Sequence, residues 1–446
     1  MIGSLLEFRN RRIALQHRVA REYGDIARLR MGVFDVVMVS SPELAHEVLV
    51  EKDDAFVKSH GLSLFARPLL GNGLLTSERA FHRKQRRMMA PAFVQKRIAA
   101  YADVMAERAE RSVDRMLESD RFDLADEAMR TTLEIVAKTL FDAEVGAEAS
   151  EIGEALTEAM ERIMGALLAL VPMPPAVPTP NNLRMKRAIA RLDRTVYRLI
   201  RERRERGEDR GDVLSMLLAS RDDDDGSGMD DRQVRDEAMT VFLAGHETTA
   251  NALVWSFYLL AKHPAARARM ETEIDDALRG RVPRFADLRS LPFTLSVVKE
   301  AMRLFPPAYV LGRRAERDVS IGGHSLSKGQ VVMINVAGIH RRPDVHARPD
   351  VFDPDRFTPE REKALPRNAY MPFGAGPRIC IGNHFALMEG QILLATYVRR
   401  LRLELVDPAL EADTDPLITL RPKGGMPMRA VPRAPRSAED HPTLVA

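Results

Sequence analysis

The sequence predicts a mostly α-helical protein with small β-sheets, built as one large domain. Long amphipathic helical patterns run from about Ala80 to Leu278, and short strand-like segments lie on either side of them. The chain has 446 residues, 45% of them hydrophobic, so it can bury a large core. Length alone would suggest two or three domains, but no repeat or shift in composition supports a boundary. We therefore expect one domain over residues 1–431 and a disordered polar tail over residues 432–446.

The N-terminal part is predicted to form a helix, a hairpin and the start of a second helix. Leu5–Glu22 has the apolar spacing of an amphipathic helix. Asp25–Ser40 alternates in a strand-like way around a glycine turn, which predicts a β-hairpin. The tripeptide Ser41-Pro42-Glu43 then supplies a cap residue and a first-turn proline for the next helix.

Two long helices and a few short strands are predicted farther along the chain. Asp230–His263 contains no proline, so it can form a helix about 50 Å long at ~1.5 Å per residue. A second helical pattern begins after Gly382 and runs to about Leu403. Val331–Val336 and Leu417–Met428 have the pattern of short strands, and the prolines between these segments indicate an irregular stretch.

Charge and cysteine content exclude several classes of protein. The net charge is only +3, so the molecule as a whole is not a strongly basic nucleic-acid binder. A single cysteine excludes an internal disulfide and cysteine-rich zinc or iron–sulfur sites, and it fits a reducing compartment. Met1–Phe8 is no secretory signal because charged residues end it, and the apolar stretch Ile163–Val177 is too short to span a membrane. We expect a soluble, cytoplasmic protein without a transmembrane anchor.

The only cysteine lies in a glycine-rich segment that reads Phe373-Gly-Ala-Gly-Pro-Arg-Ile-Cys380-Ile-Gly382. Glycines and proline make a tight turn, and the helix predicted after it places the sulfur at a helix N-terminus, where a thiolate is favoured. A lone cysteine is usually a small buried apolar residue. A turn that carries Phe373 and Arg378 packs poorly in a core, however, and it suits a flat cofactor with anionic edges. Cys380 is therefore a candidate thiolate ligand of a metal cofactor.

The middle of Asp230–His263 carries the second candidate motif, Ala244-Gly-His-Glu-Thr-Thr249. Thr248 can bond back to the carbonyl of Ala244 and open the helix locally, which leaves a groove for small molecules. Glu247 and Thr248 place an acid next to an alcohol, a pair that can relay protons. The alternative is an ordinary helix with a buried polar kink. A zinc site is excluded because the second histidine of an H-E-x-x-H motif is missing.

Charged residues recur at helical spacing elsewhere. Glu300 and Arg303 lie three apart and His82 and Arg86 four apart, so each pair shares one helix face. Alone, these are most simply a surface ion pair and a solvated basic face. The acidic run Asp222–Asp225 is expected to be a solvated turn, because arginines occupy the ligand positions of a calcium loop. A basic patch, which is either solvated or a docking surface for an acidic protein, comprises Arg83, Lys84, Arg87, Lys96 and Arg97.

The cysteine segment resembles a known signature. Phe373, Gly376, Arg378, Cys380 and Gly382 match position by position the heme-binding signature of the cytochrome P-450 family. The resemblance covers nearly the whole chain and implies the fold of that family, with the heme between the Asp230–His263 helix and the helix after the cysteine. It also implies that Cys380 is the axial ligand of iron in heme b. Arg378 would then pair with a heme propionate, and Phe373 and Gly374 would lie beside the cofactor.

The same resemblance implies roles for the other charged residues. Glu247 and Thr248 correspond to the acid–alcohol pair of the family that delivers protons during O2 activation. The further implied residues are the structural triad Glu300, Arg303 and Arg356, and the propionate donors His82, Arg86 and Arg313. The sequence leaves open whether Arg313 or Arg314 meets the propionate.

Five separated, largely apolar segments would form the substrate pocket if the family fold holds. The residues singled out in them are Leu64, Phe65, Leu168, Phe242, Ala244, Val310 and Ile418. The alternative is that these residues simply pack in the hydrophobic core. Read as a pocket, they predict a hydrophobic substrate such as a fatty acid, terpenoid, steroid or macrolide-like product.

The resemblance as a whole implies a heme-thiolate monooxygenase that hydroxylates or epoxidises such a substrate with O2. No flavin or iron–sulfur segment is fused to the chain, so a separate electron donor of ferredoxin or flavodoxin type is expected. One alternative is a heme-thiolate peroxygenase or isomerase that uses peroxide or needs no donor, against which Glu247 and Thr248 argue. Another is a non-catalytic heme-binding sensor or a heme-free helical scaffold.

Overall fold

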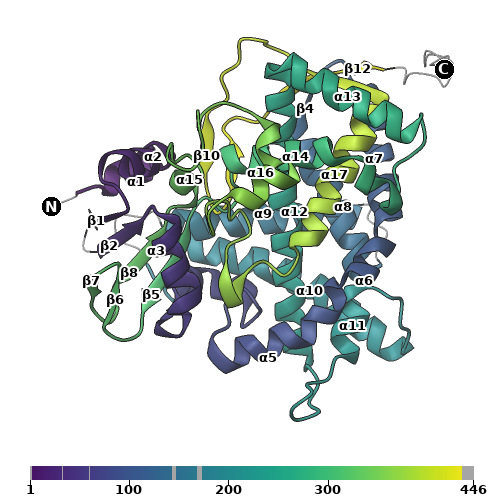
Figure 1. The fold of residues 1–446 in the computed structure, drawn as a ribbon. Coiled ribbons are helices and arrows are strands. Elements are labelled where there is room, and N and C mark those ends of the chain that lie inside the picture. The colour runs from purple at the N-terminus through teal and green to yellow at the C-terminus, as the bar shows by residue number, and fades with distance from the viewer. Residues whose placement is uncertain (1–2, 33, 60, 143–146, 168–172, 434–446) are drawn as a thin grey trace.

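Helices make up most of the protein, and small sheets lie beside them (Figure 1). The computed structural model describes residues 3–433 except 33, 60, 143–146 and 168–172. The helices are α1 (Leu5–Asn10), α2 (Arg12–Glu22), α3 (Pro42–His46), α4 (Arg67–Leu70), α5 (Arg79–Met89), α6 (Gln95–Ala100), α7 (Ala102–Leu117), α8 (Leu124–Phe141), α9 (Ala147–Leu167), α10 (Pro180–Arg206), α11 (Val213–Ala219), α12 (Asp231–Lys262), α13 (Pro264–Leu278), α14 (Pro292–Leu304), α15 (Val336–Ile339), α16 (Pro359–Ala364) and α17 (Asn383–Arg400).

The strands form one five-stranded sheet and several smaller ones. The strands are β1 (Ile26–Met31), β2 (Phe34–Val39), β3 (Phe56–Lys58), β4 (Phe122–Asp123), β5 (Leu311–Ala315), β6 (Val319–Ile321), β7 (His324–Leu326), β8 (Val331–Ile334), β9 (Leu401–Leu405), β10 (Thr414–Pro416), β11 (Leu420–Pro422) and β12 (Pro427–Pro432). The large sheet has the order β1-β2-β8-β5-β3, in which β2 and β8 are parallel. It lies with α1, α2 and α3 on the left of Figure 1, beside the helical body.

Helix α12 runs through the helical body and matches the predicted Asp230–His263 helix to within one residue at each end. Its N-cap is Asp230, whose carboxylate accepts a hydrogen bond from the N–H of Gln233 at 2.7 Å. One side of α12 packs in a core with α7, α14 and α17, and another side packs in a core with α8, α10 and α11. Because α12 is buried on most of its surface, it forms a rigid wall for whatever lies beside it.

The N-terminal helix prediction is corrected at one point. Leu5–Glu22 is not continuous: Arg11 has φ −140° and ψ 47°, which separates α1 from α2. The break turns Arg12 inward, where its guanidinium donates to the hydroxyl of Tyr309 at 2.6 Å and to the carbonyl of Pro416. The predicted hairpin is confirmed as β1 and β2. The helix opened by Ser41 is confirmed as α3, because the serine hydroxyl accepts from the N–H of Leu44 at 3.1 Å.

The C-terminal part also differs slightly from expectation. Helix α17 ends at Arg400, short of the predicted end, because the chain continues directly into β9. Strand β12 runs to Pro432, and Arg433 forms an ion pair with Asp275, so residues 432 and 433, which the prediction assigned to the tail, belong to the fold. The rest of the predicted tail, residues 434–446, lies outside the described residues. Within the described part of the chain, no helix is both long enough and apolar enough to cross a membrane.

Candidate active site

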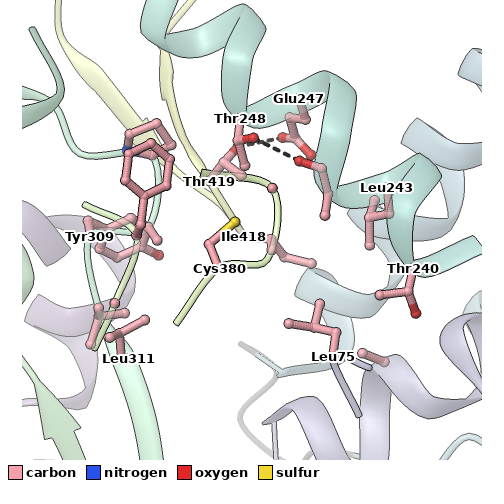
Figure 2. A pocket seen from close by; sticks show the side chains of 18 of the residues that line it. Leu75, Thr240, Leu243, Glu247, Thr248, Tyr309, Leu311, Cys380, Ile418 and Thr419 are labelled. Atoms are coloured by element: carbon pink, nitrogen blue, oxygen red, sulfur yellow. Dashed lines mark hydrogen bonds between the residues drawn. The ribbon is translucent and has the colours of Figure 1, made fainter. Parts of the chain in front are cut away.

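A cavity of about 1350 Å³ lies between α12 and the segment that precedes α17. Figure 2 shows the sulfur of Cys380 facing the same space as Thr248, which projects from α12, with Ile418 beside them. The two motifs that the sequence singled out are thus brought to one cavity from positions 132 residues apart. Most of the other lining residues are apolar, so the space excludes water except where these polar groups enter it.

The cysteine loop owes its shape to its glycines. Gly374 and Gly376 have φ values of 73° and 71°, in the left-handed region that favours glycine. A Cβ on Gly376 would lie 2.0 Å from the carbonyl oxygen of Leu49, so no other residue fits there. The N–H of Cys380 donates to the carbonyl of Phe373 at 2.9 Å and closes the loop. Both Phe373 and Gly374 line the cavity, as expected from the sequence.

The sulfur of Cys380 lies deep in the protein but is open to the cavity. Burial raises the pKa of the free thiol above its ordinary value, while the N–H of Gly382 and the guanidinium of Arg86 act in the opposite direction. A thiol in this position becomes a thiolate when it coordinates a metal cation, because the metal replaces the proton. The donor set therefore fits a single thiolate ligand to iron.

Cationic side chains cluster along one edge of the cavity. His82, Arg86, Arg313 and Arg378, all predicted from the sequence, line it together with Lys58. Arg313 lines the cavity, whereas Arg314 does not. The Nε atom of Arg313 is buried without a hydrogen-bond partner. Arg86 donates to the carbonyl of Ile379 at 2.7 Å, next to the cysteine, so α5 is held against the loop.

The electrostatics of this cluster indicate a missing anion. Burial, together with the neighbouring cations, lowers the pKa of Lys58 to about 7, of His82 to about 3 and of Arg313 to about 10. The carboxylate of Glu78 pairs with Arg378, which also donates to the carbonyl of Ser77 at 3.1 Å. A second carboxylate, that of Asp53, lies 3.8 Å from Nε of Arg378, and two carboxylates do not balance three arginines. Heme propionates fit here, because they supply negative charge where buried cations lack partners.

Sequence reasoning missed Lys58 and Glu78. Lys58 donates to the carbonyls of Leu74 at 2.9 Å and Ser77 at 3.4 Å, while Glu78 accepts from the N–H of Lys58 at 2.8 Å. A signal did exist, because alternation in β3 places Lys58 on the same side as the buried Phe56, where a lysine needs polar partners.

The α12 motif has the expected local geometry. Thr248 donates to the carbonyl of Ala244 at 2.8 Å, as the sequence predicted. Glu247 is buried, and its carboxylate accepts from the hydroxyl of Thr419 at 2.6 Å and from Nε of Arg421 at 2.7 Å. The sequence gave no sign of these two partners, which come from the C-terminal segment.

Glu300, Arg303 and Arg356 come together as one buried cluster. Arg303 forms two hydrogen bonds with the carboxylate of Glu300, at 2.7 and 2.8 Å, and Arg356 approaches the same carboxylate at 3.4 Å. Arg303 also donates to the carbonyl of His340 at 2.9 Å. Nε2 of His340 accepts from the N–H of Met371, so the cluster is linked by hydrogen bonds to the segment that begins the cysteine loop.

The predicted substrate residues divide into three groups. Phe65, Ala244, Val310 and Ile418 line the cavity, as does Leu64, whose 44% exposure places it at the mouth. The prediction for Phe242 is wrong: this residue is 3% exposed, does not line the cavity and packs 5.9 Å from the ring of Phe141. Leu168 lies outside the described residues.

A loop that lines the cavity, residues 71–77, is fastened to α12 by two carboxylates. Asp236 accepts from the N–H of Asn72, and Glu237 from the N–H of Leu74, both at 2.7 Å. The approach is so close that a Cβ on Gly71 would lie 2.0 Å from the Asp236 carboxylate. Since Leu74 lines the cavity, this attachment fixes part of its wall.

Glu237 makes the attachment pH-dependent. Burial, with help from the charge of Asp236, raises its pKa from 4.5 to about 7. A folded-state pKa above the unfolded value gives stability that is complete below pH 4.5 and lost as the pH rises through 7. Between pH 4.5 and pH 8, we expect the free energy of unfolding in urea to fall by about 3 kcal/mol more for the wild-type protein than for Glu237→Gln. Glu360→Gln on α16 is the control, and equal pH slopes for wild type and Glu237→Gln would contradict the assignment.

The basic patch is partly covered by the acidic turn, which corrects the expectation that this turn is simply solvated. Lys84 pairs with Asp225 at 2.6 Å, and Arg87 pairs with Asp222 at 3.1 Å and with Asp224. The other three residues of the patch, Arg83, Lys96 and Arg97, are exposed, and none of them forms an ion pair with a described residue. The positive charge available to a partner therefore comes from these three residues.

Comparison with known proteins agrees with this geometry. The sequence model described as Cytochrome P-450 matches residues 1–428. Cyclooctatin synthase of Streptomyces melanosporofaciens is 38% identical over 92% of this chain and 88% of that protein. Pentalenene oxygenase of Streptomyces avermitilis is 35% identical over 89% of this chain and 87% of that protein.

A solved structure extends the likeness to three dimensions. The crystal structure of the cytochrome P450DA heme domain has a TM-score of 0.86 and 28% identity, and the match covers 95% of this chain and 93% of that one. The fold class predicted from the sequence is thereby confirmed. From the matched family, the relatives and the shared fold, we conclude that the chain belongs to the cytochrome P-450 family and is a monooxygenase that uses heme iron, O2 and a redox partner.

Proposed function

We propose that this monooxygenase hydroxylates or epoxidises a terpenoid hydrocarbon or alcohol, with heme b held at Cys380 and electrons supplied by a separate ferredoxin- or flavodoxin-type protein in the cytoplasm. The observation that carries the proposal is the apolar cavity of about 1350 Å³ with Cys380 on one side and Thr248 on the other. Its size admits a cofactor together with a polycyclic substrate.

The residues have the following proposed roles. Cys380 binds iron, and Phe373 and Gly374 lie beside the cofactor. His82, Arg86, Arg313, Arg378 and Lys58 hold the propionates, since all five line the cavity and Nε of Arg313 is buried without a hydrogen-bond partner. Glu300, Arg303 and Arg356 keep the cysteine loop in place through His340 and Met371.

Heme with a thiolate ligand supplies the activation of O2 and the transfer of one oxygen atom to the substrate. The protein supplies protons, orientation and a dry cavity. Thr248 lies at the cavity with its hydroxyl hydrogen-bonded to the Ala244 carbonyl, where it can position water and O2. Glu247 brings protons from the side of the C-terminal segment to Thr248. The apolar lining orients the substrate and excludes bulk water.

The relatives favour a terpenoid over the other hydrophobic classes. Cyclooctatin synthase and pentalenene oxygenase are named for compounds that we take as models of the substrate. The lining side chains Phe65, Leu75, Val310 and Ile418 offer apolar surface from several directions, and the lining threonines are few. A compact polycycle fills such a space better than a fatty acid, whose carboxylate would compete with the propionates for the cations that line the cavity.

The proposal is tested with purified heme-loaded protein. Reduction under carbon monoxide should give the strongly red-shifted Soret band of a thiolate-ligated heme. Titration of the ferric protein should then give a high-spin shift with pentalenene and a weaker one, or none, with lauric acid and testosterone. A shift with lauric acid alone would contradict the terpenoid assignment. Turnover of pentalenene with peroxide but not with NAD(P)H, ferredoxin and its reductase would support a peroxygenase instead.

The position of the free cations leads to a prediction about electron transfer. Arg83 lies on α5, whose Arg86 contacts the cysteine loop, and it has no acidic partner among the described residues. Arg83→Glu should lower the apparent affinity for an acidic ferredoxin by about tenfold at low salt, because steering charge is reversed. Peroxide-driven turnover, which needs no donor, should stay unchanged. Arg184→Glu on α10 reverses an exposed charge elsewhere and serves as control; equal effects of both variants would disprove docking at α5.

A further inference from the structure

One face of α12 is joined to the C-terminal segment by a continuous set of hydrogen bonds. Glu247 bonds to Thr419 and Arg421. One turn later, the amide of Asn251 donates to the hydroxyl of Thr419 at 2.9 Å. After another turn, the indole N–H of Trp255 donates to the carbonyl of Leu420 at 3.0 Å. Residues four apart share one helix face, so the segment from Thr419 to Arg421 is fastened along α12.

The same segment contacts the substrate space. Leu417, Ile418 and Thr419 line the cavity, and Figure 2 shows Ile418 facing it near Cys380 and Thr419 beside Glu247. The hydroxyl of Tyr309 donates to the carbonyl of Leu417 at 2.6 Å and holds the beginning of the segment. Ile418 immediately precedes Thr419, which bonds to Glu247. A bound molecule that displaces Ile418 therefore also acts on Thr419.

Glu247 and Thr248 are bonded to different partners. The hydroxyl of Thr248 donates to Ala244, while one oxygen of the Glu247 carboxylate, Oε1, accepts from both Thr419 and Arg421. Glu247 is 2% exposed, whereas the side chain of Arg421 is 22% exposed, so the guanidinium lies between the buried acid and solvent. Breaking a charge-assisted hydrogen bond to a carboxylate in a buried site costs free energy.

We propose that Arg421, with Thr419, is a positioning residue of the proton relay: it holds Glu247 toward the C-terminal segment, and a substrate against Ile418 loosens that hold. The inference rests on the proposed role of Glu247 as proton donor. Its consequence is that proton delivery is coupled to the presence of substrate. Without the hold, Glu247 moves freely, and reduced O2 is released as hydrogen peroxide by the balance O2 + 2 e⁻ + 2 H⁺ → H2O2, with electrons from the donor protein and protons through Glu247.

The experiment compares Arg421→Gln, Arg421→Lys, Thr419→Val, Glu247→Gln and the double variant Glu247→Gln/Arg421→Gln. With NAD(P)H, ferredoxin and its reductase, hydrogen peroxide released per NAD(P)H is measured with and without pentalenene. The solvent deuterium isotope effect on oxygen consumption is measured alongside. We expect Arg421→Gln to raise substrate-free peroxide release several-fold, and Arg421→Lys to restore the wild-type value because its ammonium can still pair with Glu247. Arg429→Gln on β12 removes an exposed charge from the same region and is the matched control.

A readout independent of turnover uses urea unfolding of the same set. If Arg421 acts through Glu247, Arg421→Gln lowers stability in the wild-type background and changes little in the Glu247→Gln background. Additive effects on both stability and peroxide release, or wild-type behaviour of Arg421→Gln and Thr419→Val, would overturn the proposal. Failure of the proposed relay is recognised by a different result: Glu247→Gln would then leave the solvent deuterium isotope effect on oxygen consumption unchanged. If Arg421→Gln does not fold, Thr419→Val and Arg421→Lys decide the question.

Discussion

Replacing Cys380 with serine is expected to abolish the red-shifted Soret band of the reduced protein under carbon monoxide and to remove monooxygenase turnover. Serine has nearly the same size, so the loop closed by the N–H of residue 380 and the carbonyl of Phe373 should persist. An alcohol does not replace the thiolate, because it stays protonated near neutral pH and donates less charge to iron. The measurement is the carbon monoxide difference spectrum, with far-ultraviolet circular dichroism as the check on folding.

Ile379→Ala is the matched control for this change. Its side chain is 36% exposed and lies next to the cysteine, so its loss disturbs the loop without touching the sulfur. The control should keep the red-shifted band. Because Cys380 is the only cysteine, a Cys380→Ser protein with the wild-type band would show that the band does not arise from a cysteine thiolate, and the assignment of the whole cavity would then be wrong.

The parts of the site that depend on local sequence were predictable. The ends of α12 follow from the Asp230 cap and from the proline that begins α13. The turn before Cys380 follows from two glycines at positive φ. The bond from Thr248 to Ala244 spans one helical turn and follows from helix geometry alone.

The parts that depend on distant segments were not predictable. Glu247 meets Arg421 across 174 residues, and no periodicity in either segment reports that contact. The contacts of Glu78 with Lys58 and Arg378 likewise depend on how β3 lies against the cysteine loop. Phe242 is a different case, because helix geometry did contain the answer: it lies about 200° around α12 from Thr240, at about 100° per residue. The helical repeat should have assigned it to the core.

Replacing Arg303 with leucine is expected to lower the free energy of unfolding by about 3–5 kcal/mol, because the buried carboxylate of Glu300 then keeps only the N–H of Asp353 and the more distant Arg356, whose Nε lies 3.4 Å away. Both side chains are 0% exposed, so water cannot replace the lost partner. Arg303→Lys should recover only part of the loss, since an ammonium cannot reproduce the two parallel bonds to Glu300 together with those to the carbonyls of His340 and Pro349. Urea unfolding at constant pH measures the effect.

The control is Arg111→Leu on α7, whose partner Glu107 lies 2.5 Å away at the surface. That pair is screened by water, so its loss should change stability by less than about 1 kcal/mol. The double variant Glu300→Leu/Arg303→Leu removes the buried charge but still leaves the carbonyls of His340, Pro349 and Val351 without their donor, so it should remain less stable than wild type. Full recovery in the double variant would mean that Arg303 serves only to neutralise Glu300. Incomplete recovery, together with weaker retention of heme, would instead follow from the hydrogen bonds that connect Arg303 through His340 to Met371 and the cysteine loop.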